Sequence, residues 1–155
     1  MDDRADHDML ALELHRVFSH SRERVFDAWR RPDALMAWMG PSAAVNATEV
    51  DMDFREGGAY RIAFDDGSGR LRRVRGRYLT IDRPKRLAFT WIWSEASPAD
   101  EVETTVVLDF VEHPRGTQLH LRHLRFASAE ERQRHEAGWS GTLDKLAGHL
   151  AHERG

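Results

Sequence analysis

The stretch HEAGWSGTLDKLAGHL at residues 135–150 decides the fold. At about 100° per residue, five of its side chains fall within about 80° of one another on a helix: His135, Trp139, Leu143, Leu146 and Leu150. A helix with a largely apolar stripe of this width needs an apolar surface to cover it. We therefore predict a long helix over residues 128–152 that packs against the rest of the chain.

The residues before this helix alternate between apolar and polar side chains, which is the period of a half-buried strand. This alternation occurs around residues 9–18, 50–54, 60–64, 74–78, 87–93, 104–110 and 119–123. Turn signals, rather than helix-length patterns, separate the last six segments, and this excludes a parallel α/β sheet. We predict a curved antiparallel seven-stranded sheet whose apolar face wraps around the long C-terminal helix.

Two short helices are expected between the first and second strands. Ser21 is a typical N-cap, Pro32 interrupts the helical pattern, and Gly40-Pro41 ends it. Trp38 lies just before this turn, and it is expected either at the mouth of a cavity or as a staple that holds the short helices to the sheet. The complete order of elements indicates an α+β fold.

Five motifs resemble those of the activator-of-heat-shock-protein-ATPase-like proteins (AHSA-type), a branch of the START-like (SRPBCC) superfamily. They are VFDAWRRPDALMAWMGP (residues 25–41), DFREGGAYR (53–61), RLAFTWIW (86–93), GTQLHLRHLRF (116–126) and HEAGWSGTLDKL (135–146). The resemblance implies a helix-grip fold with a cavity between the sheet and the last helix. It implies no single reaction, because one fold hosts many functions. Met39 replaces an aromatic residue that is usual in the family, and Arg30-Arg31 replaces a common Thr-Asp, which predicts a different cavity rim.

The apolar face of the sheet, the facing helix and Trp38 supply the candidate ligand-binding residues. These are Trp38, Phe54, Tyr60, Ile62, Phe64, Val74, Tyr78, Phe89, Trp91, Trp93, Val106, Leu121, His123, His135, Trp139 and Leu143. Each ring taken singly is more typical of a core than of a ligand site. Gly76, Gly138 and Gly141 remove side-chain volume beside the rings, and this is compatible both with a cavity and with close packing of the helix on the sheet.

Two histidines are expected to be the main polar groups of the cavity. Strand alternation places His123 on the same side as Leu121, and helical spacing places His135 one turn before Trp139. A buried imidazole disfavours its charged form and can donate or accept a hydrogen bond near neutral pH. We expect both rings to point inward and to orient a ligand with a polar head.

Length and composition indicate a globular protein. The chain has 155 residues, of which 41% are hydrophobic and 32% charged, and we expect one domain over residues 9–152 with a mobile tail at residues 1–8. It has no Cys, its N-terminus does not resemble a signal peptide, and no apolar run approaches the length of a membrane span. A cytoplasmic location is expected.

Charge and histidine spacing argue against several partners. A net charge of −3 gives no overall attraction to nucleic acid or to an anionic membrane, and the arginines of residues 70–86 are interpreted as a solvated sheet face. The nine histidines show no spacing that would place two metal ligands on one helix face. No metal, cofactor or catalytic residue is therefore predicted, and a homodimer is compatible with a small domain of this family.

Three functions follow from these observations. The first is the binding of a small hydrophobic or aromatic molecule between the sheet and the C-terminal helix, in a carrier, sensor or stress-related role. The second is a polyketide cyclase- or hydrolase-like enzyme in which His123, His135 or Tyr78 performs acid–base chemistry. The third, implied by the resemblance, is an interaction with a chaperone whose ATPase the protein would activate. Binding is favoured because few polar groups are available in the predicted cavity.

Overall fold

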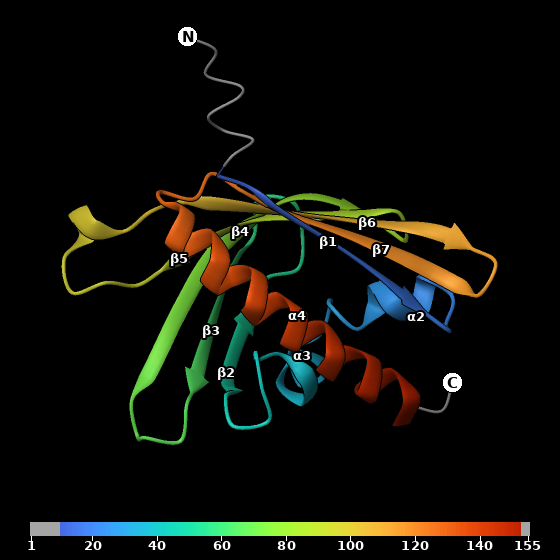
Figure 1. Ribbon diagram of the computed structural model, residues 1–155, viewed down its shortest axis with the longest axis horizontal. Coiled ribbons are helices and arrows are strands. Elements are labelled where there is room, and N and C mark those ends of the chain that lie inside the picture. The colour runs from blue at the N-terminus through green and yellow to red at the C-terminus, as the bar shows by residue number, and fades with distance from the viewer. Residues whose placement is uncertain (1–9, 153–155) are drawn as a thin grey trace, which may run out of the picture.

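The computed structural model describes residues 10–152, so the tail predicted at residues 1–8 lies outside the described residues. The elements are β1 (Leu12–Phe18), α2 (Arg22–Asp27), α3 (Pro32–Trp38), β2 (Asn46–Met52), β3 (Ala59–Asp65), β4 (Leu71–Asp82), β5 (Arg86–Trp93), the 3-10 turn η1 (Pro98–Asp100), β6 (Thr104–His113), β7 (Gly116–Leu124) and α4 (Ala129–His152). Within these residues the strands form one antiparallel sheet in the order β1-β7-β6-β5-β4-β3-β2. Helix α4 crosses its concave face (Figure 1). The predicted α+β helix-grip architecture is confirmed.

The boundaries of three elements differ slightly from expectation. Strand β1 begins at Leu12 rather than at residue 9, and β2 ends at Met52, so Phe54 lies beyond the strand. Helix α4 begins at Ala129, directly after Ser128, whose hydroxyl accepts a hydrogen bond from the Glu131 N–H at 3.2 Å. Ser128 therefore caps the helix and satisfies one of its free N–H groups.

The core lies between α4 and the concave face of the sheet. Leu108 and Leu121 of the sheet are fully buried, as are Leu143 and Leu146 of α4, and all four belong to one cluster. Each fully buried leucine contributes roughly 1.5–3 kcal/mol of hydrophobic stabilisation. Helix α3 packs between β2 and α4, while α2 packs against β6 and β7.

Trp38 is a structural staple rather than a residue at a cavity mouth. Its side chain is fully buried, and its indole N–H donates to the Ala28 carbonyl oxygen at 3.1 Å. Its ring packs edge-on against Trp29, with centroids 4.7 Å apart. The indole thus ties α3 to the end of α2 and fixes both short helices.

Trp38→Ala should therefore destabilise the protein by about 3–5 kcal/mol, because it removes a large buried ring and leaves the Ala28 carbonyl without its partner. Met36 lies on the same helix and is 45% exposed, so Met36→Ala is a matched control that should change stability little. Urea unfolding of both variants measures the difference. A loss of less than about 1 kcal/mol for Trp38→Ala would contradict the staple role.

Two of the three glycines beside the aromatic residues serve close packing. A Cβ at Gly141 would collide with the Pro41 carbonyl oxygen, and a Cβ at Gly76 would collide with the Thr90 carbonyl oxygen. Helix α4 can approach the turn after α3 only because Gly141 has no side chain. At Gly138 a Cβ would meet nothing closer than Pro41 Cβ, at 3.8 Å, which is an ordinary contact, so this position tolerates a side chain.

Gly141→Ala should destabilise the protein by roughly 1–3 kcal/mol, because the added methyl group would force α4 away from Pro41. Gly148 lies on the same helix, and a Cβ there would meet nothing within 4 Å. Gly148→Ala should instead stabilise the protein by up to about 1 kcal/mol through helix propensity. If Gly141 is required for packing, the melting temperature should fall in Gly141→Ala and rise in Gly148→Ala. Equal changes of the melting temperature in the two variants would contradict this role.

Candidate functional site

A cavity of about 1100 Å³ lies between the N-terminal half of α4 and the part of the sheet formed by β3 to β6. Five of the predicted ligand-binding residues line it: Phe64, Trp91, Trp93, His135 and Trp139. Residues from connecting segments complete the lining, among them Met39, Pro41, Val45, Val102 and Phe126. Val102 is 43% exposed, so the cavity opens to solvent beside the β5–β6 connection.

The other predicted residues do not line this cavity: Trp38, Phe54, Tyr60, Ile62, Val74, Tyr78, Phe89, Val106, Leu121, His123 and Leu143. Much of the remaining concave face is filled by aromatic packing. Tyr78 has ring centroids at 5.0, 5.4 and 6.3 Å from Phe54, Tyr60 and Phe89. These rings meet Phe26 of α2 and the nearby Trp29, so aromatic packing fills the concave face beside α2.

Alternation along the strands cannot distinguish a ring that faces a cavity from one that faces another ring. The lining residues in the connections carried no periodic signal, and this is why Pro41, Val45 and Phe126 were not predicted. Met39, expected from the sequence only to alter the rim, is buried and lines the cavity.

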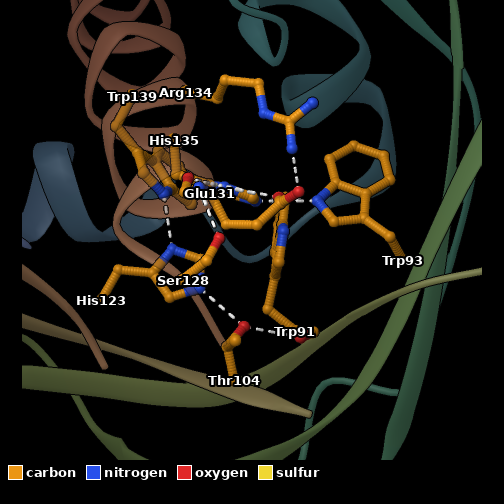
Figure 2. A network of polar contacts seen from close by, with 9 residues as sticks. All are labelled: Trp91, Trp93, Thr104, His123, Ser128, Glu131, Arg134, His135 and Trp139. Carbon is orange, nitrogen blue, oxygen red and sulfur yellow. Dashed lines mark hydrogen bonds and ion pairs between the residues drawn. The ribbon is translucent and has the colours of Figure 1, made fainter. Parts of the chain in front are cut away.

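His123 is fully buried beneath the cavity wall, and both of its ring nitrogens are engaged (Figure 2). Nδ1 accepts a hydrogen bond from the Trp139 indole N–H at 2.9 Å. The Thr104 hydroxyl donates to the Trp91 carbonyl oxygen at 2.7 Å, so its oxygen must accept from His123 Nε2–H, also at 2.7 Å. Burial and the nearby His135 lower the pKa of His123 well below its usual value, and the ring is neutral.

His135 is held in the opposite tautomer. Its Nε2 accepts from the Trp93 indole N–H at 2.9 Å, and its Nδ1 lies 2.8 Å from the Glu131 carbonyl oxygen. A carbonyl oxygen can only accept, so the proton is on Nδ1. Burial lowers the pKa of His135, and this ring too is neutral. The imidazoles lie edge-to-face, 5.1 Å apart.

These hydrogen bonds change the role expected of the two histidines. Both rings point inward, as predicted, but their four nitrogens already bind Trp139, Thr104, Trp93 and the Glu131 backbone, so none remains for a ligand. The histidines instead hold two indoles of the cavity wall in place. Trp91 is the wall residue with an unused donor: its buried indole N–H has no hydrogen-bond partner among residues 10–152.

Charged groups at the mouth are also largely engaged. The Arg72 guanidinium lies over the Trp93 ring, 4.5 Å from its centroid, and Arg134 forms an ion pair with Glu131 (Figure 2). The mouth also carries Asp66 and Asp100. The deep wall of the cavity is thus neutral and aromatic, and its charges are confined to the rim.

The neutral histidines predict a specific dependence of stability on pH. Their folded pKa values lie below the unfolded value of about 6.5, so below that pH the unfolded state binds more protons and stability falls as the pH falls. The slope can reach about 1.4 kcal/mol per pH unit for each histidine. His123→Gln keeps a donor and an acceptor but cannot titrate, so it should lose part of this slope.

Urea unfolding between about pH 7.5 and about pH 5 measures the slope. The control is His152→Gln, because His152 is exposed at the end of α4 and takes no part in the hydrogen bonds of His123. Equal slopes for His123→Gln and the wild type would show that His123 is not held neutral.

Residues 19–151 match the family described as Activator of Hsp90 ATPase homolog 1-like protein. The chain belongs to this family. The resemblance noted in the sequence motifs is therefore confirmed, and it extends over almost all of the described fold. No curated protein matches the chain significantly.

Several solved structures share the fold of this chain. The AHSA1 protein from Silicibacter pomeroyi is 30% identical with a TM-score of 0.79, over 93% of this chain and 99% of that one. Protein CV1439 from Chromobacterium violaceum is 27% identical with a TM-score of 0.79, over 89% and 95% of the two chains. Protein Ms6760 from Mycobacterium smegmatis, at 24% identity, a TM-score of 0.80 and coverage of 97% and 96%, shares the fold. Within residues 10–152, no helix is long and apolar enough to cross a membrane.

Proposed function

We propose that this protein binds a small, largely apolar molecule in the cavity between α4 and the β3–β6 part of the sheet. The observation that carries the proposal is a space of about 1100 Å³ walled by the indoles of Trp91, Trp93 and Trp139. Cavities of roughly 300–1000 Å³ with mainly apolar walls and few polar groups are typical of small-molecule sites. Two of these indoles are fixed by hydrogen bonds, Trp139 to the buried His123 and Trp93 to the partly buried His135, so much of the wall is formed before a ligand arrives.

A neutral ligand fits this wall better than an anion. A deep carboxylate would need a charged or donating partner, but His123 and His135 are neutral and have no free N–H. The arginines Arg72 and Arg134 lie at the mouth, where they already contact Trp93 and Glu131. A carbonyl or ether oxygen that reached the Trp91 N–H would instead satisfy a buried donor that lacks a partner.

The enzyme alternative finds less support in this geometry. Acid–base catalysis needs a group whose proton or lone pair reaches the substrate. The nitrogens of His123 and His135 are occupied, while Tyr78 lies outside the cavity lining and burial raises its pKa. Binding without a reaction at these residues is therefore the function that the arrangement supports best.

Filling the cavity from α4 tests the proposal. Gly138 lines the cavity and has room for a side chain, so Gly138→Leu should occupy ligand space without breaking the packing at Gly141. The neutral fluorescent probe N-phenyl-1-naphthylamine should bind the wild type with a Kd of about 1–10 μM and bind Gly138→Leu at least about tenfold more weakly.

Gly148→Leu provides the matched control, because it adds the same side chain to the same helix outside the cavity. It should bind the probe as the wild type does. A wild type that binds no probe, or a Gly138→Leu variant that binds it normally, would remove the basis for the proposal. Native mass spectrometry of freshly purified protein then identifies any retained ligand.

A further inference from the structure

Glu13, His15 and His120 lie together on the convex face of the sheet, opposite to the face that α4 covers. His15 of β1 is directly opposite His120 of β7, and Glu13 precedes His15 by two residues on the same face of β1. The cluster therefore combines a cross-strand pair with a diagonal neighbour, which places three side chains within mutual reach. Glu13 and His15 are exposed.

The three side chains already interact. The imidazoles of His15 and His120 are stacked, with centroids 4.2 Å apart and planes inclined by 14°. His120 Nε2 lies 3.3 Å from Glu13 Oε2. One ligand atom from each residue can be chosen so that all three lie within 4.8 Å of one another.

We propose that Glu13, His15 and His120 form a binding site for a divalent transition-metal ion of the zinc type, with solvent completing its coordination. Two imidazoles and a carboxylate are ligands that Zn²⁺ accepts, and imidazole favours Zn²⁺, Ni²⁺ and Cu²⁺ over Mg²⁺ and Ca²⁺. This site is independent of the cavity, because it lies on the other face of the sheet.

The required rearrangement is small. Bonds of about 2.0–2.2 Å to a tetrahedral ion place the ligand atoms about 3.3–3.6 Å from one another. The three ligand atoms must therefore approach one another by about 1 Å. The two stacked imidazole rings must also tilt until their nitrogen lone pairs point at the same ion. No backbone shift is needed, because directly opposed positions of an antiparallel pair already hold the Cβ atoms about 4.5–5.5 Å apart.

Neighbouring charges leave the ligands available. Asp109 of β6 is directly opposite His120, but its carboxylate binds Arg86 at 2.6 Å and Arg122 at 3.5 Å. Arg122 is directly opposite Glu13, and its charge is partly balanced by this contact with Asp109. The Glu13 carboxylate already lies beside His120, so it is available to a metal ion bound by the histidines.

The spacing rule used for the sequence could not find this site. That rule searches for ligands one turn apart on a helix, whereas His120 lies 107 residues from Glu13 in the chain. Only the pairing of β1 with β7 brings them together.

Titration of the full chain, purified without a histidine tag, with ZnCl₂ in a calorimeter tests the proposal. We expect one site with a Kd of about 1–10 μM, and at least about tenfold weaker binding for each of His15→Gln, His120→Gln and Glu13→Gln. His152→Gln removes an exposed histidine at the far end of α4 and should bind as the wild type does. Thermal unfolding in a chelator shows that each variant is folded before titration.

The imidazole proton resonances of His15 and His120 provide a second measurement. In the wild type they should shift on addition of Zn²⁺, while those of His152 should not. The proposal is wrong if the wild type does not bind Zn²⁺ below about 100 μM, or if His15→Gln and His120→Gln retain wild-type affinity.

Discussion

The buried hydrogen bond from the Trp139 indole to His123 Nδ1 fixes α4 on the sheet. It continues through Thr104 to the backbone of Trp91, so one chain of polar contacts joins the helix to β7, β6 and β5. Hydrophobic burial along the leucine stripe holds the helix down, but it tolerates small rotations and shifts because it is not directional. A buried donor left unpaired costs roughly 1–3 kcal/mol, and this penalty selects one rotation and one register for α4.

Hydrogen bonds of this kind also help to keep the cavity open at one end of the sheet. Trp139 and Trp93 are each held at the indole nitrogen by a histidine, so neither can swing into the space beside it. At the other end of the sheet, Phe26 of α2 and the adjacent Trp29 meet the tyrosine and phenylalanine cluster and fill the concave face. Hydrogen bonds thus hold two indoles of the cavity wall in place, while the rings at the other end fill the concave face by packing against one another.

Most of the fold could be predicted from the sequence, because the helical and the strand periodicity are both strong. The apolar stripe that ends at Leu150 predicts the long helix, and the spacing of Phe89, Trp91 and Trp93 at every second position is typical of the strands. The candidate site could be predicted only in part. Alternation identifies the concave face but not its hollow portion, and loop residues such as Val45 have no period. Histidines on that face were correctly placed inward, yet their partners depend on the three-dimensional meeting of Trp139 with His123, which no spacing rule encodes.

The residues that fix the cavity wall by hydrogen bonds differ from other residues that shape the cavity. The atoms that fix the wall are the indole and imidazole nitrogens, whereas other lining residues, such as Phe64 and Val102, contribute no hydrogen bond to that network. A change in shape at those positions would alter the space without removing a buried polar partner, so its cost is limited to packing. Replacement of His123 or Trp139 would instead leave a buried nitrogen unpaired and remove the hydrogen bond that fixes the rotation of α4. The shape of the cavity can therefore vary at these lining positions while the hydrogen-bonded indoles and imidazoles hold the fold.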